Sequence, residues 1–159
     1  MSMLDKTAAE REISEMSDIL DTNQDASDFY ASAQNQVQNT QMQSTFKELE
    51  SLHRSTVTNI KEAMRSRGAK PEQLETKESV GGKMSRMFGE IKAKMADQTD
   101  DSLIKSLEEA EDKCLHAIQD LMKNEKVSQE LKNTLQAEYD RLRKSHDHMK
   151  ALKQRVTAA

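Results

Sequence analysis

The sequence predicts an all-α fold: a four-helix bundle in which one long crossover joins two antiparallel helix pairs. All four glycines and the only proline fall between Gly68 and Gly89. Helix interiors tolerate these residues least, so they divide the chain into helix, breaker region and helix. On both sides apolar residues recur every three or four positions, and no sustained period-2 alternation competes. With 159 residues, we expect one domain spanning 1–159.

The apolar spacing before the breaker region predicts two helices, at about 8–38 and about 41–66. The inner stripe of the first helix turns polar from Asn23 onward, and Gly68 followed by Pro71 marks the end of the second. The first stripe consists of Ile13, Met16, Leu20, Asn23, Ser27, Tyr30, Gln34 and Val37, and the second of Met42, Phe46, Leu49, His53, Val57, Ile60 and Met64.

Two further helices follow the breaker region, at about 100–124 and about 129–156. Asp100 or Asp101 suits the N-cap of the first, and Ser128 suits that of the second. The connection within each helix pair is short, which indicates antiparallel neighbours, whereas the crossover at about 67–99 is long enough to run the length of the bundle. The crossover carries a short amphipathic helix with an apolar stripe formed by Val80, Met84, Met87, Ile91 and Met95.

Composition excludes several classes of protein. The formal net charge is −4, so the chain lacks the basic excess by which proteins neutralise nucleic-acid phosphates. Cys114 is the only cysteine, and an intramolecular disulfide is therefore impossible. No apolar run has the length of a signal peptide or of a membrane span, and we expect a cytoplasmic protein with no transmembrane segment.

Five polar residues on or beside the inner stripes are the candidate site. Asn23, His53, Glu111 and His146 fall in the stripes of four different helices, and Glu50 lies one turn before His53 in a Glu-x-x-His spacing. Imidazole and carboxylate groups inside a bundle can hold a divalent metal. They can equally form a hydrogen-bonded cluster, because buried polar groups need partners. We favour a structural cluster of Asn23, His53, Glu111 and His146 over a metal site of Glu50, His53, Glu111 and His146.

Several short motifs carry a resemblance to a known family. They are Phe29-Tyr30-x-x-Ala33, Phe46-x-x-Leu49 in a helix that ends at Arg67-Gly68, Leu107-Glu108-x-x-Glu111-Asp112, and His146-Asp147-x-Met149-x-x-Leu152. With this order, the chain resembles the ferritin-like superfamily, and more closely a bacterial family of small four-helix-bundle proteins of unknown function, over roughly residues 10–155.

The resemblance implies where the ligands of a di-iron centre would fall. Ferritin-like di-iron proteins use a Glu on each of two helices and a Glu-x-x-His on each of the other two. The matching positions here are Asn23, His53 with Thr56, Glu111, and Arg143 with His146. Only Glu111 and His146 keep the expected type, and Arg143 places a positive charge where a carboxylate belongs.

These departures predict a bundle that is not an enzyme. The resemblance implies a stress-associated protein that acts by self-association, as a homo-oligomer, or by binding a protein partner, and we prefer no cofactor. The alternative is a protein that binds iron or another divalent metal at a reduced site. A third possibility, which we favour less, is a peripheral adaptor whose crossover helix engages a membrane or protein surface.

Overall fold

The computed structural model describes residues 7–75 and 85–157, and within them every regular element is a helix. The α-helices are α1 (Ala8–Ala33), α2 (Thr40–Ser66), α3 (Ser85–Lys94), α4 (Asp100–Lys123) and α5 (Gln129–Thr157), with the short 3-10 helices η1 (Pro71–Gln73) and η2 (Met95–Asp97). The all-α prediction is confirmed, and a helix covers each of the four long segments that the periodicity marks.

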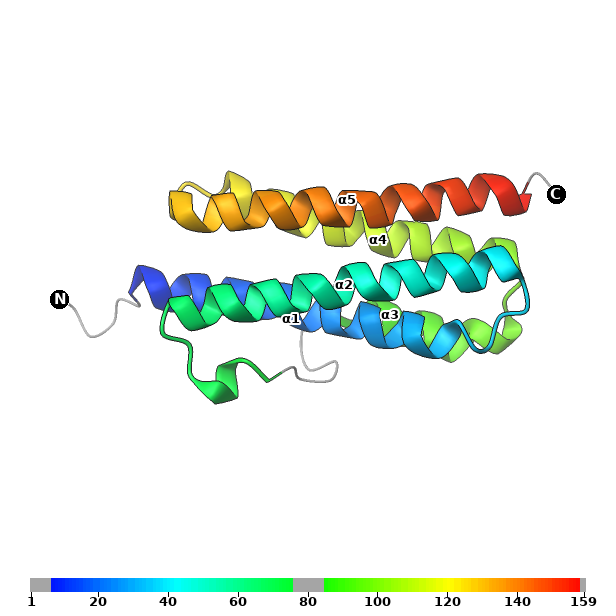
Figure 1. Ribbon diagram of the computed structural model, residues 1–159, viewed down its shortest axis with the longest axis horizontal. Coiled ribbons are helices and arrows are strands. Elements are labelled where there is room, and N and C mark those ends of the chain that lie inside the picture. Colours follow the sequence, from blue (N-terminus) through cyan, green and yellow to red (C-terminus); the bar gives the residue numbers. More distant parts are fainter. Residues whose placement is uncertain (1–6, 76–84, 158–159) are drawn as a thin grey trace.

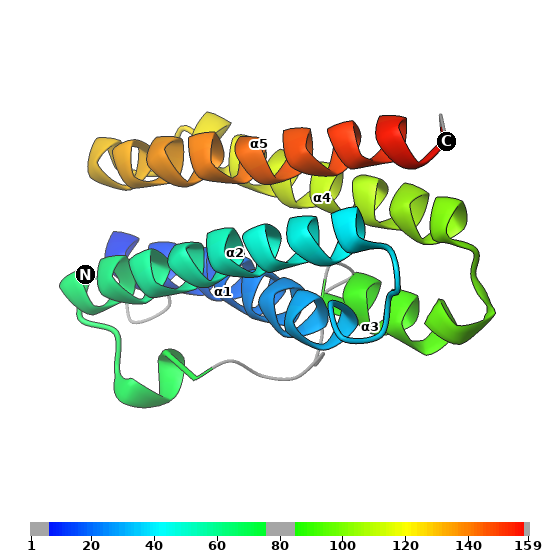
Figure 2. The same ribbon diagram turned by 45° about the vertical axis from the view of Figure 1, so that its right-hand side comes forward.

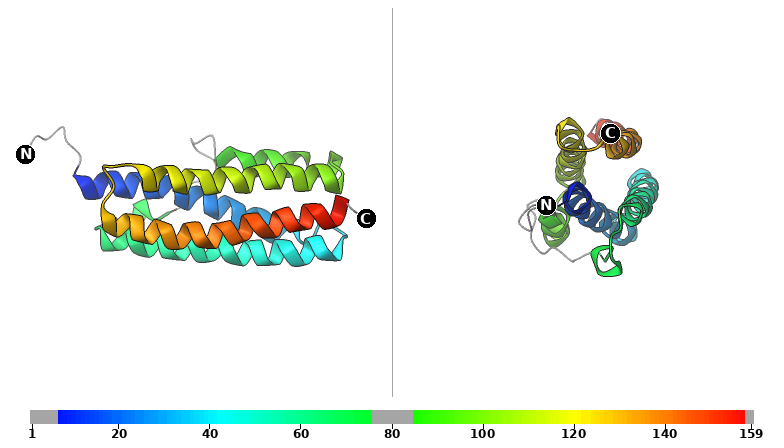
Figure 3. Two further views of the ribbon diagram at one scale, coloured as in Figure 1. Left: turned by 90° about the horizontal axis from the view of Figure 1, so that it is seen from above. Right: turned by 90° about the vertical axis from the view of Figure 1, so that its left-hand side faces the viewer.

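The four long helices pack side by side into an elongated body (Figure 1). The chain runs along α1 and returns along α2, and later runs along α4 and returns along α5. The end-on view shows α2 beside α5, and the contact between these two helices joins the two pairs (Figure 3). The short helix α3 lies beside α1 and α4 at one end of the body (Figure 2). This packing is compatible with a helical bundle.

The helix ends show which local signals the sequence pattern identified correctly. Gly68 ends α2 with a positive φ of 88°, and the amide of Ala69 reaches back to the carbonyl of Met64 at 3.0 Å. Ser128 accepts a hydrogen bond from the amide of Leu131 at the start of α5, as an N-cap does. Gly68 and Ser128 therefore act as the helix end and the helix start that the sequence predicts.

Two predicted ends are corrected. The first helix ends at Ala33 instead of about 38, because Asn39 caps the start of α2 and the intervening residues form a turn in which Val37 is buried. The N-cap of α4 is Thr99, whose hydroxyl accepts from the amide of Ser102 at 3.2 Å, so Asp100 and Asp101 lie in the first turn of the helix. A carboxylate there still favours the helix dipole.

The apolar interior consists of two clusters. The aromatic cluster lies at the end with the α1–α2 turn and includes Phe29, Tyr30, Phe46, Phe88, Leu107, Cys114 and Met149. The aliphatic cluster lies toward the start of α1 and includes Met16, Leu20, Ile60, Ile118, Leu135 and Leu142. Because α3 packs into the aromatic cluster, the crossover completes one end of the core.

The predicted stripe of the crossover helix is only partly the buried face of α3. Ile91 is buried, and Met87 and Met95 pack partly against the aromatic cluster. Val80 and Met84 lie outside the described residues. Phe88, which the stripe omitted, is the most deeply buried described side chain of α3. Among the described residues, no helix is long and apolar enough to cross a membrane.

Candidate functional site

One polar side chain from each long helix is buried at mid-height in the bundle. These are Asn23 of α1, His53 of α2, Glu111 of α4 and Ser145 of α5, and together with Tyr30 of α1 we call them the polar layer. Asn23, His53 and Ser145 each fall between the residues of the aromatic cluster and those of the aliphatic cluster on their helix, whereas Tyr30 belongs to the aromatic cluster. The layer therefore interrupts the apolar interior.

Both nitrogens of His53 have partners. Asn23 donates its side-chain amide to the carbonyl of Ile19 at 2.8 Å, which leaves its Oδ1 to face His53 Nδ1 at 2.7 Å. His53 Nδ1 is therefore the donor in that contact. The other nitrogen, Nε2, lies 2.7 Å from Glu111 Oε1, with the Ser145 hydroxyl 3.3 Å away. With Glu111 ionised, the ring carries both protons and the two side chains form a buried ion pair.

Tyr30 completes the environment of the carboxylate. Its hydroxyl donates to the same Glu111 oxygen at 2.7 Å, and its ring is stacked on the imidazole of His53 at a centroid distance of 5.8 Å. Two donors therefore converge on one carboxylate oxygen. Hydrogen bonds to the ionised form of an acid are stronger than neutral ones, and they stabilise that form.

The electrostatics of the layer follow from this geometry. Burial by itself would raise the pKa of Glu111, but the charge of His53 and the hydrogen bonds from His53 and Tyr30 outweigh it, so the pKa lies below the ordinary value of 4.5. Burial raises the pKa of the Tyr30 phenol well above its usual range, and Glu111 raises it further. Burial and the same carboxylate also raise the pKa of Cys114. Its thiol therefore stays protonated and is a poor nucleophile.

Two oxygens at this depth have no hydrogen-bond partner among the described residues. They are Glu111 Oε2 and the hydroxyl of Thr56, which lies one turn after His53 on α2. Buried polar atoms are nearly always paired, and each one without a partner needs an explanation. At this depth, Glu111 Oε2 and the Thr56 hydroxyl could therefore each make one further polar contact.

The sequence-predicted site residues separate into two groups. The structure brings Asn23, His53 and Glu111 together, but His146 lies on the flank of α5 and faces Asp112 and Asp147 at 3.5 and 3.4 Å. Glu50 also lies outside the layer, where it accepts a hydrogen bond from Gln34 at 3.1 Å and pairs with Arg54. The expected inward position of His146 is therefore corrected, whereas Glu50 lies beside the stripe of α2, as expected.

The buried polar residues outside the sequence-predicted site include Tyr30, Ser145 and Glu138. Tyr30 enters the sequence analysis as part of a helical stripe and of a family motif, and Ser145 stands next to the histidine that the stripe favours. Glu138 of α5 is buried against α2, where Asn59 donates to it at 3.2 Å and Arg141 lies 3.7 Å away. A signal for Ser145 and Glu138 was present, because both lie at helical spacing from Leu142.

The donor set does not fit the di-iron centre that the family resemblance implies. Such a centre needs four carboxylates and two imidazoles, whereas the layer offers one of each, and they are hydrogen bonded to each other. Within residues 7–75 and 85–157, no three His, Cys, Asp or Glu side chains are placed to hold a metal ion. Arg143, at the matching position of a ligand, is exposed to solvent.

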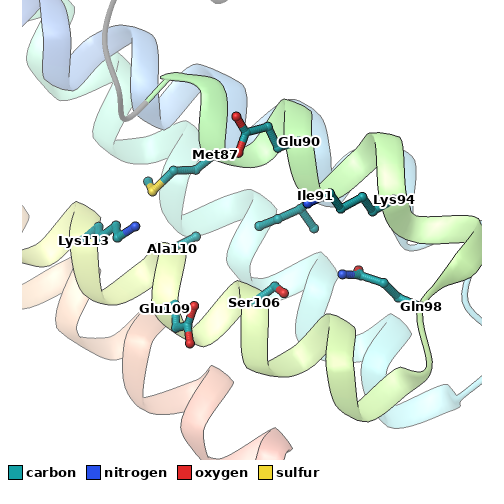
Figure 4. A pocket seen from close by; sticks show the side chains of 9 residues that line it. All are labelled: Met87, Glu90, Ile91, Lys94, Gln98, Ser106, Glu109, Ala110 and Lys113. Carbon is teal, nitrogen blue, oxygen red and sulfur yellow. The ribbon is translucent and has the colours of Figure 1, made fainter.

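Several open grooves lie on the surface of the described residues. Figure 4 shows one of about 180 Å³ between α3 and α4, with Met87 and Ile91 on one side and Ala110 on the other. Charged side chains of both signs surround it, including Glu90 and Lys113. Ser106 and Glu109 of α4 complete the polar part of its lining.

Fold and site together define a small helical bundle with a hydrogen-bonded polar layer in its interior. Residues 11–124 match the model of DUF2383, a domain of unknown function, and the chain belongs to that family. The matched region covers α1 from Arg11 onward, α2, α3 and α4, and it includes every residue of the polar layer except Ser145. No curated protein and no solved structure matches the chain.

Proposed function

We propose that this protein is a non-catalytic, ferritin-like four-helix bundle, with two antiparallel helix pairs joined by a crossover, that acts by associating with itself or with a protein partner. In this proposal the polar layer is structural. A His–Glu ion pair stands where ferritin-like enzymes hold metal, and it fixes how the four helices align. A stress-associated role rests on the resemblance alone and stays a prediction.

One observation carries the proposal: each nitrogen of His53 is already engaged by a residue of another helix. A metal ligand needs a free nitrogen lone pair, and here a proton lies between Nε2 and Glu111 instead. To bind metal, the layer would first have to lose its own ion pair. The histidine and the acid therefore satisfy each other.

The second candidate is binding of a single divalent cation, such as iron. The unpaired Glu111 Oε2 and Thr56 hydroxyl favour it, because both are oxygen donors buried beside an imidazole. This candidate needs fewer ligands than a di-iron centre. It differs from the first in requiring that metal stabilise the folded state.

Elemental analysis of protein purified without a metal-chelating tag tests both candidates. We expect no stoichiometric iron, manganese or zinc, and a melting temperature that does not rise as each free metal is titrated. The matched variants are His53→Gln, in the layer, and His146→Gln, on the surface. A stoichiometric metal that His53→Gln abolishes and His146→Gln retains would establish the second candidate.

Sedimentation equilibrium over a wide range of protein concentrations tests the association part. A particle mass that rises with concentration, or a fixed multiple of the chain mass, supports self-association. A monomer at every concentration leaves a protein partner as the required alternative. In that case, if purification from the native cells recovers no bound protein, the association part of the proposal is wrong.

A further inference from the structure

The short helix α3 is held less securely than the other four α-helices. It has 10 residues, whereas isolated helices shorter than about 12–15 residues are marginal in water. Gly89 lies in its middle, and glycine there costs about 1 kcal/mol relative to alanine. Only Phe88 and Ile91 of its described side chains are buried. Its helical state therefore depends on packing against α1 and α4.

What α3 covers is the polar layer. The ring centroid of Phe88 lies 6.1 Å from that of Tyr30 and 6.5 Å from that of His53. A third ring, Phe29, lies 5.9 Å from Phe88. The apolar ring of Phe88 therefore packs against two members of the layer, and it belongs to α3, the least securely held α-helix.

The side of α3 that faces α4 is already open to solvent. The groove of Figure 4 runs between the two helices, and Glu90 and Lys94 of α3 line it together with Glu109 of α4. On its other side α3 packs against α1. Undocking of α3 would break its contacts with α1 and α4 and would leave the contacts of α2 with α1 and α5 untouched.

We infer that α3 is a detachable cover over the polar layer: it undocks and unfolds locally, well below the free energy of global unfolding, and gives water and solutes access to His53, Tyr30 and Glu111. Proteins open locally in units that bury few apolar side chains, and α3 is such a unit. The closed state keeps the ion pair dry, and the open state hydrates it while the four long helices stay packed. The inference does not depend on whether the layer is structural or binds a cation.

Cys114 provides a probe for this opening. It is the only cysteine, it is buried, and it belongs to the aromatic cluster together with Phe88 and Ile91. We expect a thiol reagent to label it in native protein with a much weaker urea dependence than global unfolding, because a local opening exposes little surface. Amides of α3 should exchange with deuterium through the same opening, faster than the amides of α2 and α5.

Three variants sharpen the test. Phe88→Ala should accelerate labelling of Cys114 by about a hundredfold, from the usual weakening of cores by such substitutions. Gly89→Ala should slow it by about fivefold, since its added methyl meets no atom within 4 Å and helix propensity improves. The control is Leu135→Ala in the aliphatic cluster, which weakens the bundle away from α3.

The outcomes separate clearly. Slower labelling in Gly89→Ala, with little acceleration in Leu135→Ala under native conditions, supports the detachable cover. The inference would be overturned if, in the wild-type protein, labelling of Cys114 and amide exchange in α3 depended on urea as strongly as amide exchange in α2 and α5 does. This measurement does not require any variant to fold. Equal acceleration by Phe88→Ala and Leu135→Ala would overturn it as well.

Discussion

Removing Glu111 tests the ion pair most directly. In Glu111→Leu, the His53 Nε2 and the Tyr30 hydroxyl both lose the acceptor that each reaches at 2.7 Å. A buried group that loses its partner costs about 1–3 kcal/mol, and breaking a buried ion pair costs about 3–5 kcal/mol. We therefore expect the free energy of unfolding to fall by about 3–5 kcal/mol. Glu111→Gln keeps a neutral oxygen acceptor but removes the negative charge, so we expect it to lose the ion pair and still cost less than Glu111→Leu.

The partner variant completes a double-mutant cycle. His53→Leu should also be destabilising, because it leaves Glu111 charged and buried with Tyr30 as its main donor. The double variant removes both charges, and we expect it to be more stable than the sum of the single effects by about 1–3 kcal/mol. Urea unfolding followed by far-ultraviolet circular dichroism measures all four proteins. Single effects that add within about 0.5 kcal/mol would refute the ion pair.

Three further predictions concern acid, the surface histidine and the end of α2. The pKa of Glu111 in the folded protein lies below 4.5, so the ionised carboxyl stabilises the fold above pH 4.5, and this stability is lost as the pH falls through the folded-state pKa. Urea unfolding over a pH series measures the effect, and Glu111→Gln should lack it. His146→Gln should change the unfolding free energy by less than about 1 kcal/mol, because its ion pairs are at the surface, whereas His53→Gln should cost more. Gly68→Ala should lower thermal stability by about 1 kcal/mol, since its φ of 88° strains any residue with a side chain. An unchanged melting temperature would mean that α2 ends differently in solution.

The fold was predictable because its signals are long and repetitive. Each long helix carries an apolar stripe over more than six turns, and glycine and proline occur only between the pairs. Caps were harder, because Thr99, Asp100 and Asp101 are all good N-cap residues and the choice depends on the angle at which the chain enters α4. Periodicity finds a helix well, but it places the ends only to within a few residues.

The candidate site shows the same limit at the level of one residue. In α5, Ser145 and His146 lie on either side of the line from Leu142 to Met149, so the stripe alone does not choose between them. Packing of α5 against α2 turns Glu138 and Ser145 inward and moves His146 to the flank. Phe88 was missed for a related reason, because a helix of 10 residues is too short to define its buried face by periodicity.

The polar layer also divides its groups between the two halves of the chain. Asn23, Tyr30 and His53 precede the crossover, and the acid they need follows it, at Glu111. A hairpin of α1 and α2 therefore discriminates against any helix pair that lacks a carboxylate at that height. It does not discriminate against a second copy of the same chain, whose α4 and α5 present the identical groups. If two copies of this chain exchanged halves, the layer would re-form across them without any new contact, as in a domain-swapped dimer.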